Sequence, residues 1–465
     1  MLTPAALEVI STWELVGIGI TLLISAYLIF ELSVALLRPP RAPISEPDSR
    51  LPFVSVVIPV YDEPPEVLRA ALASWDRVRY PSFEVILADD SPVPAEVDTS
   101  RVRVIRRDNR EGFKGGALRN AFRQLHPDSE WMFVFDADYV VDPDILARFS
   151  AHFRPGVGGI QGFMAMGLNQ ERSHLVQFSE ALHDIAGTLL VGRFRHGGFV
   201  GVQGTVQAYR VEAIRSLGGI APEFTANEDL DTTFRLRKAG WKIVYDPNIV
   251  GQGLAPDTYR AFFVQITRWT ATTVREYRRH WGSFARSREV PFVEKVDSLL
   301  FLLTWMNALV VAPTFLFLPW ALFVLRLIPL WLSIVISLLP FFVFMITAIA
   351  RRAVRRGLVA WLWYYILLLP GSVVMFRATL LGLFTEPGFS RTPKGSSASA
   401  TKSVVLSAPR NALPLASGTA GGSSFVRRMT CHQCGQELTH PEVFFYAVAA
   451  MDVERTECRL CVAGA

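Results

Sequence analysis

Cysteine and charge are both scarce in this chain. All four cysteines of the 465 residues come after residue 430, so neither a disulfide framework nor a cysteine-ligated metal site is available before that point. Charged residues make up 19% of the sequence, and the arginines lie beside apolar runs rather than in one continuous stripe. That pattern argues against a nucleic-acid-binding protein. No internal repeat is present, which excludes repeat architectures.

Apolar side chains are abundant instead. Hydrophobic residues account for 51% of the sequence and aromatic residues for 12%, and the mean hydropathy is +0.29. A wholly soluble domain rarely has this composition. The net charge of +5 fits a membrane protein whose cytoplasmic flanks are basic.

The first apolar run, residues 13–37, is long enough to cross a bilayer. It has neither a small-residue cleavage site nor an early basic region, so we interpret it as an anchor rather than a signal peptide. Arg38 and Arg41 follow, which predicts an outside N-terminus and a cytoplasmic segment after the run. Glu14 and Glu31 lie near its ends, where a charge costs little.

Further apolar segments lie in the second half of the chain. Residues 296–318 and 329–350 predict two more spans, and the basic run 351–356 should be cytoplasmic. Residues 358–384 contain Pro370, and we expect a helix pair lying in the membrane interface there rather than one clean span. The chain is therefore expected to be a multi-pass integral protein of the plasma (inner) membrane.

Between these segments, residues 51 to about 290 predict a cytoplasmic α/β domain. Strands that alternate with helices favour a mostly parallel, Rossmann-like sheet. The expected strands are residues 53–60, 83–88, 102–107 and 131–135, and the expected helices are residues 64–75 and 115–125.

Acidic residues follow three of the expected strands. In an open parallel sheet the carboxyl ends of the strands meet at one crevice, where ligands bind. Acids gathered there would repel one another unless a cation or hydrogen-bond donors share the site. A single acidic pair is also compatible with simple capping of a turn, whereas three successive pairs favour a site. The pairs are Asp62 with Glu63, Asp89 with Asp90, and Asp136 with Asp138.

Asp136 and Asp138 are the expected metal ligands. Alternate residues of an extended chain face the same way, so both carboxylates should flank one ion. Oxygen ligands suit Mg²⁺ or Mn²⁺. Such an ion would hold a diphosphate and stabilise it as a leaving group.

Two further candidates lie at the starts of helices. Lys114 stands before a glycine pair at the start of a helix, a favourable place for phosphate, although such a turn is common. Asp229 follows Glu228 at the start of another helix, where the dipole favours acids in any case. The functional interpretation makes Asp229 a general base.

The stretch that contains Gln265, Arg268 and Trp269 offers a sugar-binding pattern. Trp269 provides an apolar face for a sugar ring, and Arg268 suits a diphosphate. An amphipathic helix on the membrane surface is the alternative, and both can hold at once. Four arginines of this stretch look purely interfacial: Arg275, Arg278, Arg279 and Arg286.

The order of these motifs along the chain resembles that of the family 2 glycosyltransferases. More narrowly, it resembles that of the membrane-embedded processive synthases of cellulose and glucomannan. The segment FSRTPKG, residues 389–395, is similar to the gating loop of cellulose synthases, and the resemblance covers roughly residues 50 to 395. It implies a GT-A catalytic domain inserted between transmembrane helices, with Asp229 as the catalytic base and, of the pair Asp136 and Asp138, Asp138 as the favoured metal ligand. It implies nucleotide-sugar binding by Asp62, Glu63, Asp89, Asp90, Lys114, Asp136, Arg268, Thr392 and Lys394, and acceptor binding by Gln265, Trp269, Gln203 and Gly204.

The expected function is inverting transfer from UDP-glucose or GDP-mannose to a growing β-1,4-linked polysaccharide. Cellulose synthases carry more transmembrane helices, so a homo-oligomer or a membrane partner would complete a polymer channel. A lipid glycosyltransferase and a catalytically inactive membrane scaffold are the alternatives. No residue distinguishes glucose from mannose donors, and nucleic acid is not an expected partner.

The C-terminal segment predicts a small metal-binding module. Cys431, Cys434, Cys458 and Cys461 form two Cys-x-x-Cys pairs with the spacing of a four-cysteine zinc site. Disulfides or free thiols are the alternative, and the expected cytoplasmic location disfavours disulfides. The expected domains are 1–50 (anchor and linker), 51–290 (catalytic), 291–388 (membrane and interfacial helices), 389–395 (gating loop), 396–424 (flexible linker) and 425–465 (zinc-ribbon-like module).

Overall fold

The structure is a computed structural model of the chain that divides into two units, Met1–Gly395 and Ser396–Ala465, each described by itself. The residues that it describes are 4–37, 51–97, 101–169, 174–220, 227–306, 309, 358–385, 429–430 and 437–438.

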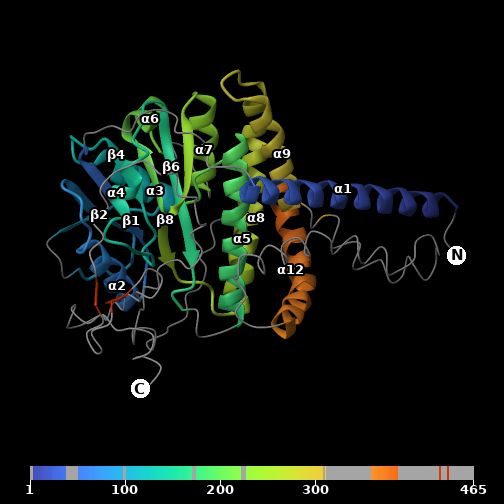
Figure 1. Cartoon of the computed structure of the whole chain (residues 1–465), viewed down its shortest axis with the longest axis horizontal. Helices are drawn as coiled ribbons and strands as arrows, with labels where there is room; N and C mark the ends of the chain where they lie inside the picture. Colours follow the sequence, from blue (N-terminus) through green and yellow to red (C-terminus); the bar gives the residue numbers. More distant parts are fainter. Residues whose placement is uncertain are drawn as a thin grey trace. The chain divides into compact units, whose positions relative to one another are not determined.

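The first unit is built on a mixed sheet whose strand order is β3-β2-β1-β4-β7-β6-β8-β5 (Figure 1). Strands β3, β2, β1 and β4 pair in parallel, as predicted, and β6 pairs in parallel with β8. Strand β7 pairs antiparallel with β4 and β6, and β5 pairs antiparallel with β8. The bounds are β1 Val54–Val60, β2 Phe83–Asp89, β3 Val102–Arg106, β4 Trp131–Val134, β5 Val140–Val141, β6 Val157–Met166, β7 Gln207–Arg210 and β8 Lys242–Gly253.

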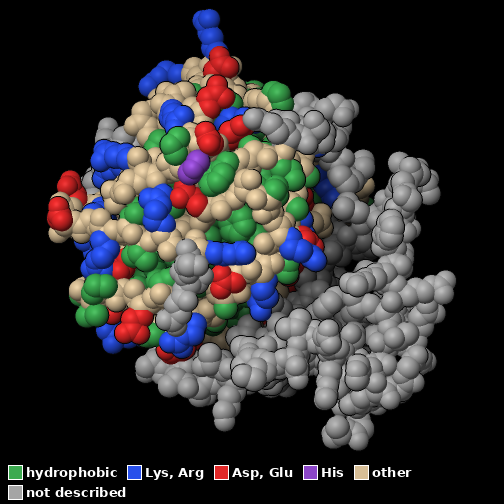
Figure 2. Space-filling view, turned by 90° about the vertical axis from the view of Figure 1, so that its left-hand side faces the viewer, with side chains coloured by type: hydrophobic (Ala, Val, Ile, Leu, Met, Phe, Trp, Pro, Cys, Tyr) green, Lys and Arg blue, Asp and Glu red, His purple; other side chains and the backbone are tan. Residues whose placement is uncertain are grey.

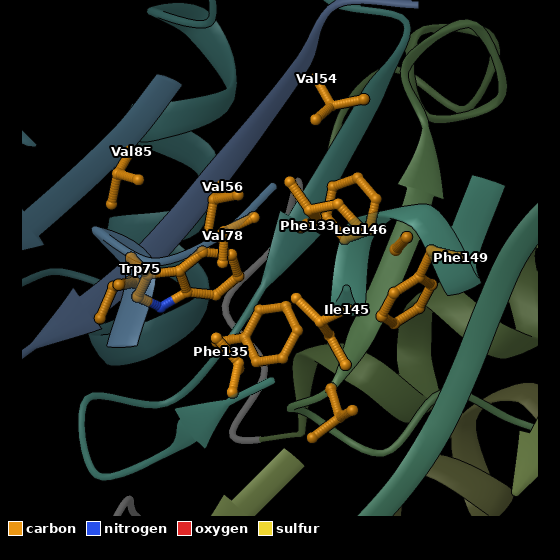
Figure 3. Packing of buried hydrophobic residues seen from close by; sticks show 14 of the residues in the cluster. Val54, Val56, Trp75, Val78, Val85, Phe133, Phe135, Ile145, Leu146 and Phe149 are labelled. Carbon is orange, nitrogen blue, oxygen red and sulfur yellow. The ribbon is translucent and has the colours of Figure 1, made fainter. Parts of the chain in front are cut away.

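Parallel pairing brings the acidic pairs to one edge of the sheet, as expected. Val60 at the end of β1 pairs with Asp89 at the end of β2, and Val57 pairs with Val134 at the end of β4. Most apolar side chains of these strands are buried and pack against helices α2 (Pro65–Trp75) and α4 (Ile145–Ser150) (Figure 3). The ring of Phe135, for example, meets Trp75 edge to face at 4.9 Å. The core therefore fixes the edge at which the acids lie.

Helices cover this sheet and extend beyond it (Figure 1). Helix α5 packs along β6 and β8, α8 contacts α7, α9 and α12, and α1 lies against α5. The predicted helices 64–75 and 115–125 are confirmed as α2 and α3. The bounds are α1 Pro4–Leu37, α2 Pro65–Trp75, α3 Phe113–Arg123, α4 Ile145–Ser150, α5 His174–His196, α6 Val211–Ser216, α7 Glu228–Lys238, α8 Tyr259–Arg286, α9 Phe292–Met306 and α12 Leu358–Phe384.

One continuous helix, α12, replaces the helix pair expected over residues 358–384, so that expectation is wrong. A proline inside a helix removes one backbone hydrogen bond, but packing of α12 against α8 compensates. A Cβ on Gly382 would lie 2.4 Å from the carbonyl oxygen of Ala271, and Arg278 of α8 donates to the carbonyl oxygen of Leu383 at 2.6 Å. This close approach of two backbones stabilises α12 as a single element.

Among the described residues, one helix is long and apolar enough to cross a membrane, Gly19–Leu37 of α1, with a mean hydropathy of 2.2. This agrees with the first predicted span by length and composition. Its Glu31 is buried and lies 2.8 Å from Nε2 of His196 on α5, instead of facing a membrane interface. Residues 329–350 and most of 307–318 lie outside the described residues.

On the face of the molecule shown in Figure 2, acidic and basic side chains are interspersed with apolar ones.

In the second unit the described residues are β9 Met429–Thr430 and β10 Glu437–Leu438, which pair antiparallel. The four cysteines of that unit, and Thr392 and Lys394 of the expected gating loop, lie outside the described residues.

Candidate active site

Lys114 is the centre of a charged cluster to which α3, the turn after β4, the loop before β7 and α7 all contribute. Its Nζ donates to Asp136 Oδ1 at 2.6 Å and to the carbonyl oxygen of Gly204 at 2.8 Å, and lies 3.7 Å from Glu228 Oε1. Burial alone would lower the pKa of Lys114, but the carboxylates of Asp136 and Glu228 raise it to about 12. Lys114 is therefore a permanent cation in the cluster.

The turn before α3 holds Lys114 in place through Arg107. Arg107 Nε donates to Asp90 Oδ1 at 2.7 Å, and its NH1 donates to the carbonyl oxygen of Glu111 at 2.5 Å. A Cβ on Gly116 would lie 1.9 Å from the same carbonyl oxygen and 2.2 Å from Arg107 NH1. Asp90, expected to bind the nucleotide sugar, thus has a positioning contact within the protein itself.

Asp89 shapes the loop after β2. Its carboxylate accepts from Ser91 N at 2.9 Å and from Ala95 N at 3.0 Å, and it is ion-paired with Arg106. Burial alone would raise the pKa of Asp89, but these hydrogen bonds and the guanidinium lower it. Ser91 Oγ in turn accepts from the backbone N–H of Asp62 at 2.8 Å. The loops after β1 and β2 are therefore tied together.

Asp136 and Asp138 lie in a turn rather than in an extended chain. Strand β4 ends at Val134, and Tyr139 N donates to the carbonyl oxygen of Asp136 at 3.1 Å. The argument from strand alternation is therefore wrong for this pair, because the chain leaves the sheet first. Asp136 N also donates to Thr205 Oγ1 at 2.9 Å, which fixes the turn beside the Gly204 loop.

The turn still suits a hard cation. Burial raises the pKa of Tyr139 well above its ordinary value, and the nearby charges of Asp138 and Asp136 raise it further, which puts both carboxylates close to this side chain. Both residues offer carboxylate oxygens, which Mg²⁺ and Mn²⁺ prefer. Asp136 and Asp138 are the residues that would hold such an ion.

Asp229 has the properties of a general base. It occupies the first turn of α7, whose N-terminus is capped because Asn227 Oδ1 accepts from Leu230 N at 3.2 Å. Burial, and then the charge of Glu228, raise the pKa of Asp229 to about 7, against the opposing effect of Lys114. A base with a pKa near neutrality is the most effective for proton abstraction at that pH.

The loop with Gln203 and Gly204 is held by buried amide side chains. Gln203 N donates to Gln161 Oε1 at 2.7 Å, and Gly204 N donates to Gln207 Oε1 at 2.8 Å. Gly204 has φ +90°, and a Cβ there would lie 3.2 Å from Asp229 Oδ2. The loop thus runs directly past Asp229. Sequence reasoning missed Gln161 and Gln207 because their partners are backbone groups of a loop that no local pattern identifies.

Helix α8 brings Arg268 into the same cluster. Burial lowers the pKa of Arg268, against the opposing effect of the charges of Asp136, Glu228 and Asp229. Gln265 is buried one turn earlier on α8. The cluster thus contains two cations, Arg268 and Lys114, and the three carboxylates just named. An incoming diphosphate would therefore meet a site with too little positive charge unless a metal ion accompanies it.

Trp269 lies on the next part of α8. It packs against Met166, Val176 and Ala255 and is only partly buried, so part of the ring remains for a ligand.

One of the four arginines expected to be purely interfacial is not, since Arg275 is 8% exposed. Because α12 and α7 cover α8, that part of the helix lies against protein instead of a membrane surface.

Comparison with known proteins agrees with this arrangement. Residues 52–272 match the model of the glycosyltransferase-like family 2. The probable glucomannan 4-beta-mannosyltransferase 9 of Oryza sativa subsp. japonica is 29% identical over 273 residues, 54% of this chain and 51% of that protein. Glucomannan 4-beta-mannosyltransferase 2 of Arabidopsis thaliana is 28% identical over 361 residues, 72% of this chain and 66% of that protein. The chain thus spans about half to two thirds of these relatives.

A solved structure shares the fold. It is a mannosyltransferase from Pyrobaculum calidifontis in complex with GDP-Man and Mn²⁺, with a TM-score of 0.53 at 18% identity, covering 80% of this chain and 99% of that chain. The mixed sheet and its covering helices are accordingly a GT-A fold. Residues 52–272 of this chain form a domain of the glycosyltransferase-like family 2.

Proposed function

We propose that the protein is a membrane-bound hexosyltransferase that transfers mannose from GDP-mannose to a growing β-1,4-linked mannan or glucomannan. The observation that carries the proposal is the cluster of Lys114, Asp136, Glu228 and Arg268 around Asp229, whose pKa is raised to about 7. The names of the curated relatives and the GDP-Man of the solved mannosyltransferase favour mannose over glucose.

The proposed reaction is a single displacement. Asp229 takes the proton of the acceptor hydroxyl as its oxygen forms the new bond to the anomeric carbon. The bond from that carbon to the diphosphate oxygen breaks, the electron pair leaves with the diphosphate, and the anomeric centre inverts. One base and one stabilised leaving group suffice, so no carboxylate nucleophile is needed.

The remaining residues hold the donor and the acceptor in this proposal. Lys114 and Arg268 place positive charge beside the departing diphosphate. When bound at Asp136 and Asp138, Mg²⁺ or Mn²⁺ would supply further positive charge there. We assign Asp62, Glu63, Asp89 and Asp90 to the nucleotide site, Asp89 and Asp90 as residues that position its loops. Gln265, Trp269, Gln203 and Gly204 are assigned to the acceptor. Thr392 and Lys394, which lie outside the described residues, are assigned to the donor from the expected gating loop alone.

Exposed apolar side chains support the membrane part of the proposal. Leu37 of α1 is 82% exposed, Phe292 of α9 is 77% exposed and Phe384 of α12 is 76% exposed. A contiguous apolar surface marks a contact with a membrane or a partner, and on α1 this surface also includes the exposed Leu22, Leu23, Ile29, Phe30 and Leu36. We place the catalytic domain on the cytoplasmic side of the plasma membrane. The same surface favours a second candidate, in which the acceptor is a membrane lipid.

The donor and the metal are tested together. Membrane vesicles that carry the protein should incorporate label from GDP-mannose, and not from UDP-glucose, into water-insoluble polymer when Mn²⁺ is present. Chelation with EDTA should abolish incorporation, and Mn²⁺ or Mg²⁺ should restore it. Label in the organic phase would identify a lipid acceptor instead. Absence of transfer from every donor would refute the enzymatic proposal.

The C-terminal unit is proposed to bind one structural Zn²⁺. Strand β9 ends directly before Cys431, and strand β10, which pairs antiparallel with it, begins three residues after Cys434. This arrangement supports a metal-binding hairpin. We expect one zinc per purified full-length chain by metal analysis, and its loss when Cys431 and Cys434 are both replaced by Ser. A chain with four reactive thiols and no zinc would contradict this assignment. Cys458 and Cys461 would complete the ligand set.

A further inference from the structure

Helix α5 carries a polar side chain on a face that is otherwise packed. Val176 and His183 are seven residues apart, so two helical turns bring them to the same face. Val176 packs against Trp269, and the ring of His183 meets the ring of Trp269 edge to face, with centroids 5.8 Å apart and planes at 69°. Farther along, a Cβ on Gly187 would lie 2.5 Å from the ring of Phe163. His183 therefore lies between two tightly packed positions, and Glu180 is the other polar side chain on this face.

The hydrogen bond of His183 fixes its tautomer. Nδ1 lies 2.7 Å from the carbonyl oxygen of Ser179. Because a carbonyl oxygen only accepts, the Nδ1–H must donate. Burial lowers the pKa of His183, so the ring is neutral at neutral pH and carries one proton. Nε2 is consequently a lone-pair acceptor beside Trp269.

In the part of the chain that the structure describes, no protein group donates a hydrogen bond to this Nε2. His183 is only partly buried as a residue, so a ligand can approach it. An acceptor atom left without a donor beside an aromatic ring is suited to a sugar, which stacks its apolar face on the ring and donates from its hydroxyls.

We propose that His183 binds the acceptor saccharide, with Nε2 accepting a hydrogen bond from a hydroxyl of the sugar that lies on Trp269. This assignment rests on the proposed function and adds a specificity-determining residue on α5 to the site. The donor cluster around Lys114 shares no hydrogen bond with His183. His183 should therefore affect the acceptor and leave the donor unaffected.

The test uses full-length protein in membranes, GDP-mannose, Mn²⁺ and β-1,4-linked mannotetraose as the acceptor. We expect His183→Leu to raise the KM for mannotetraose about five- to tenfold, the effect of one lost hydrogen bond, with kcat and the KM for GDP-mannose unchanged. His183→Gln keeps a side-chain acceptor and should recover part of the loss. His126→Leu is the matched control, because His126 is a surface histidine that stacks on Phe53.

The outcomes separate this inference from the proposed function. If wild type transfers mannose and His183→Leu keeps the wild-type KM for mannotetraose, the assignment of His183 is wrong and the function stands. A joint fall of kcat and thermal stability, with no change in that KM, would show a structural role only. If wild type uses neither GDP-mannose nor another sugar nucleotide, both proposals fail.

Discussion

The Asp229→Asn variant is expected to lose glycosyl transfer by roughly 10²–10⁴-fold and still bind the sugar nucleotide. Asn has nearly the same shape as Asp and retains one acceptor oxygen, so the N-terminal turn of α7 should survive. It cannot take a proton from the acceptor hydroxyl. Transfer is measured with labelled donor, and binding by the protection that donor and Mn²⁺ give against thermal unfolding.

The dependence of wild-type kcat/KM on pH provides a second test of Asp229. Asp229 must be deprotonated to act, and its pKa is about 7, so log(kcat/KM) should fall with a slope near one as the pH decreases below 7. A raised carboxyl pKa means that the ionised form destabilises the fold above the ordinary carboxyl range. At pH 8 the Asn variant should therefore unfold at a higher temperature than wild type.

A matched control makes the result specific. Asp128→Asn removes a carboxylate whose side chain is 82% exposed and should leave transfer unchanged. Wild-type turnover in Asp229→Asn would refute the base assignment. A variant that is inactive and unfolds at a lower temperature would instead show that Asp229 supports the fold.

Replacing Lys114 with Met should have the second largest effect. The change leaves Asp136, Glu228 and Asp229 without the cation that they share, in a largely buried site. Breaking such a buried pairing costs about 3 kcal/mol, so the free energy of unfolding should fall by that order in denaturant titration. Transfer should be lost by at least about 100-fold, with a raised KM for the donor.

The sign of the pH effect follows from the same contact. Lys114 lowers the pKa of Asp229, so its removal raises that pKa and moves the acidic limb of any residual activity to higher pH. Lys114→Arg keeps the charge and should shift the limb less. Lys242→Met is the control, because Lys242 is exposed at the start of β8. An unshifted limb in Lys114→Met would show that the two side chains are not coupled.

The parallel half of the sheet could be predicted from the sequence because β1, β2 and β4 are apolar runs followed by acids. Strand β7 was not predicted: it has four residues, Gln207–Arg210, and its antiparallel pairing depends on β4 and β6, which are distant in sequence. Helix α12 was misjudged at Pro370 because the contact that holds it, between Gly382 of α12 and Ala271 of α8, is tertiary. Sequence patterns within one segment could not predict β7 or the continuity of α12, because both depend on contacts with segments distant in the sequence.

For the candidate site, the order of motifs sufficed to bring Lys114, Asp136, Asp229 and Arg268 together, through resemblance to a known family. Physical reasoning from the strand period gave the wrong account of Asp136 and Asp138, since the chain turns after Val134. The residues that support the site had no local signature. Arg107, Thr205, Gln161 and Gln207 act through backbone atoms, and only the fold shows which ones.

The contact between Arg107, Asp90 and the turn before α3 has an evolutionary consequence. Arg107 joins a carboxylate to the carbonyl oxygen of Glu111, and the space beside both is open only because residue 116 is glycine. Replacing Arg107 or Gly116 would release the turn, whereas loss of Asp90 would leave Arg107 bonded to the carbonyl oxygens of Glu111 and Phe113. Arg107 and Gly116 should thus be inherited and lost together as one epistatic unit, to which Asp90 is coupled less tightly.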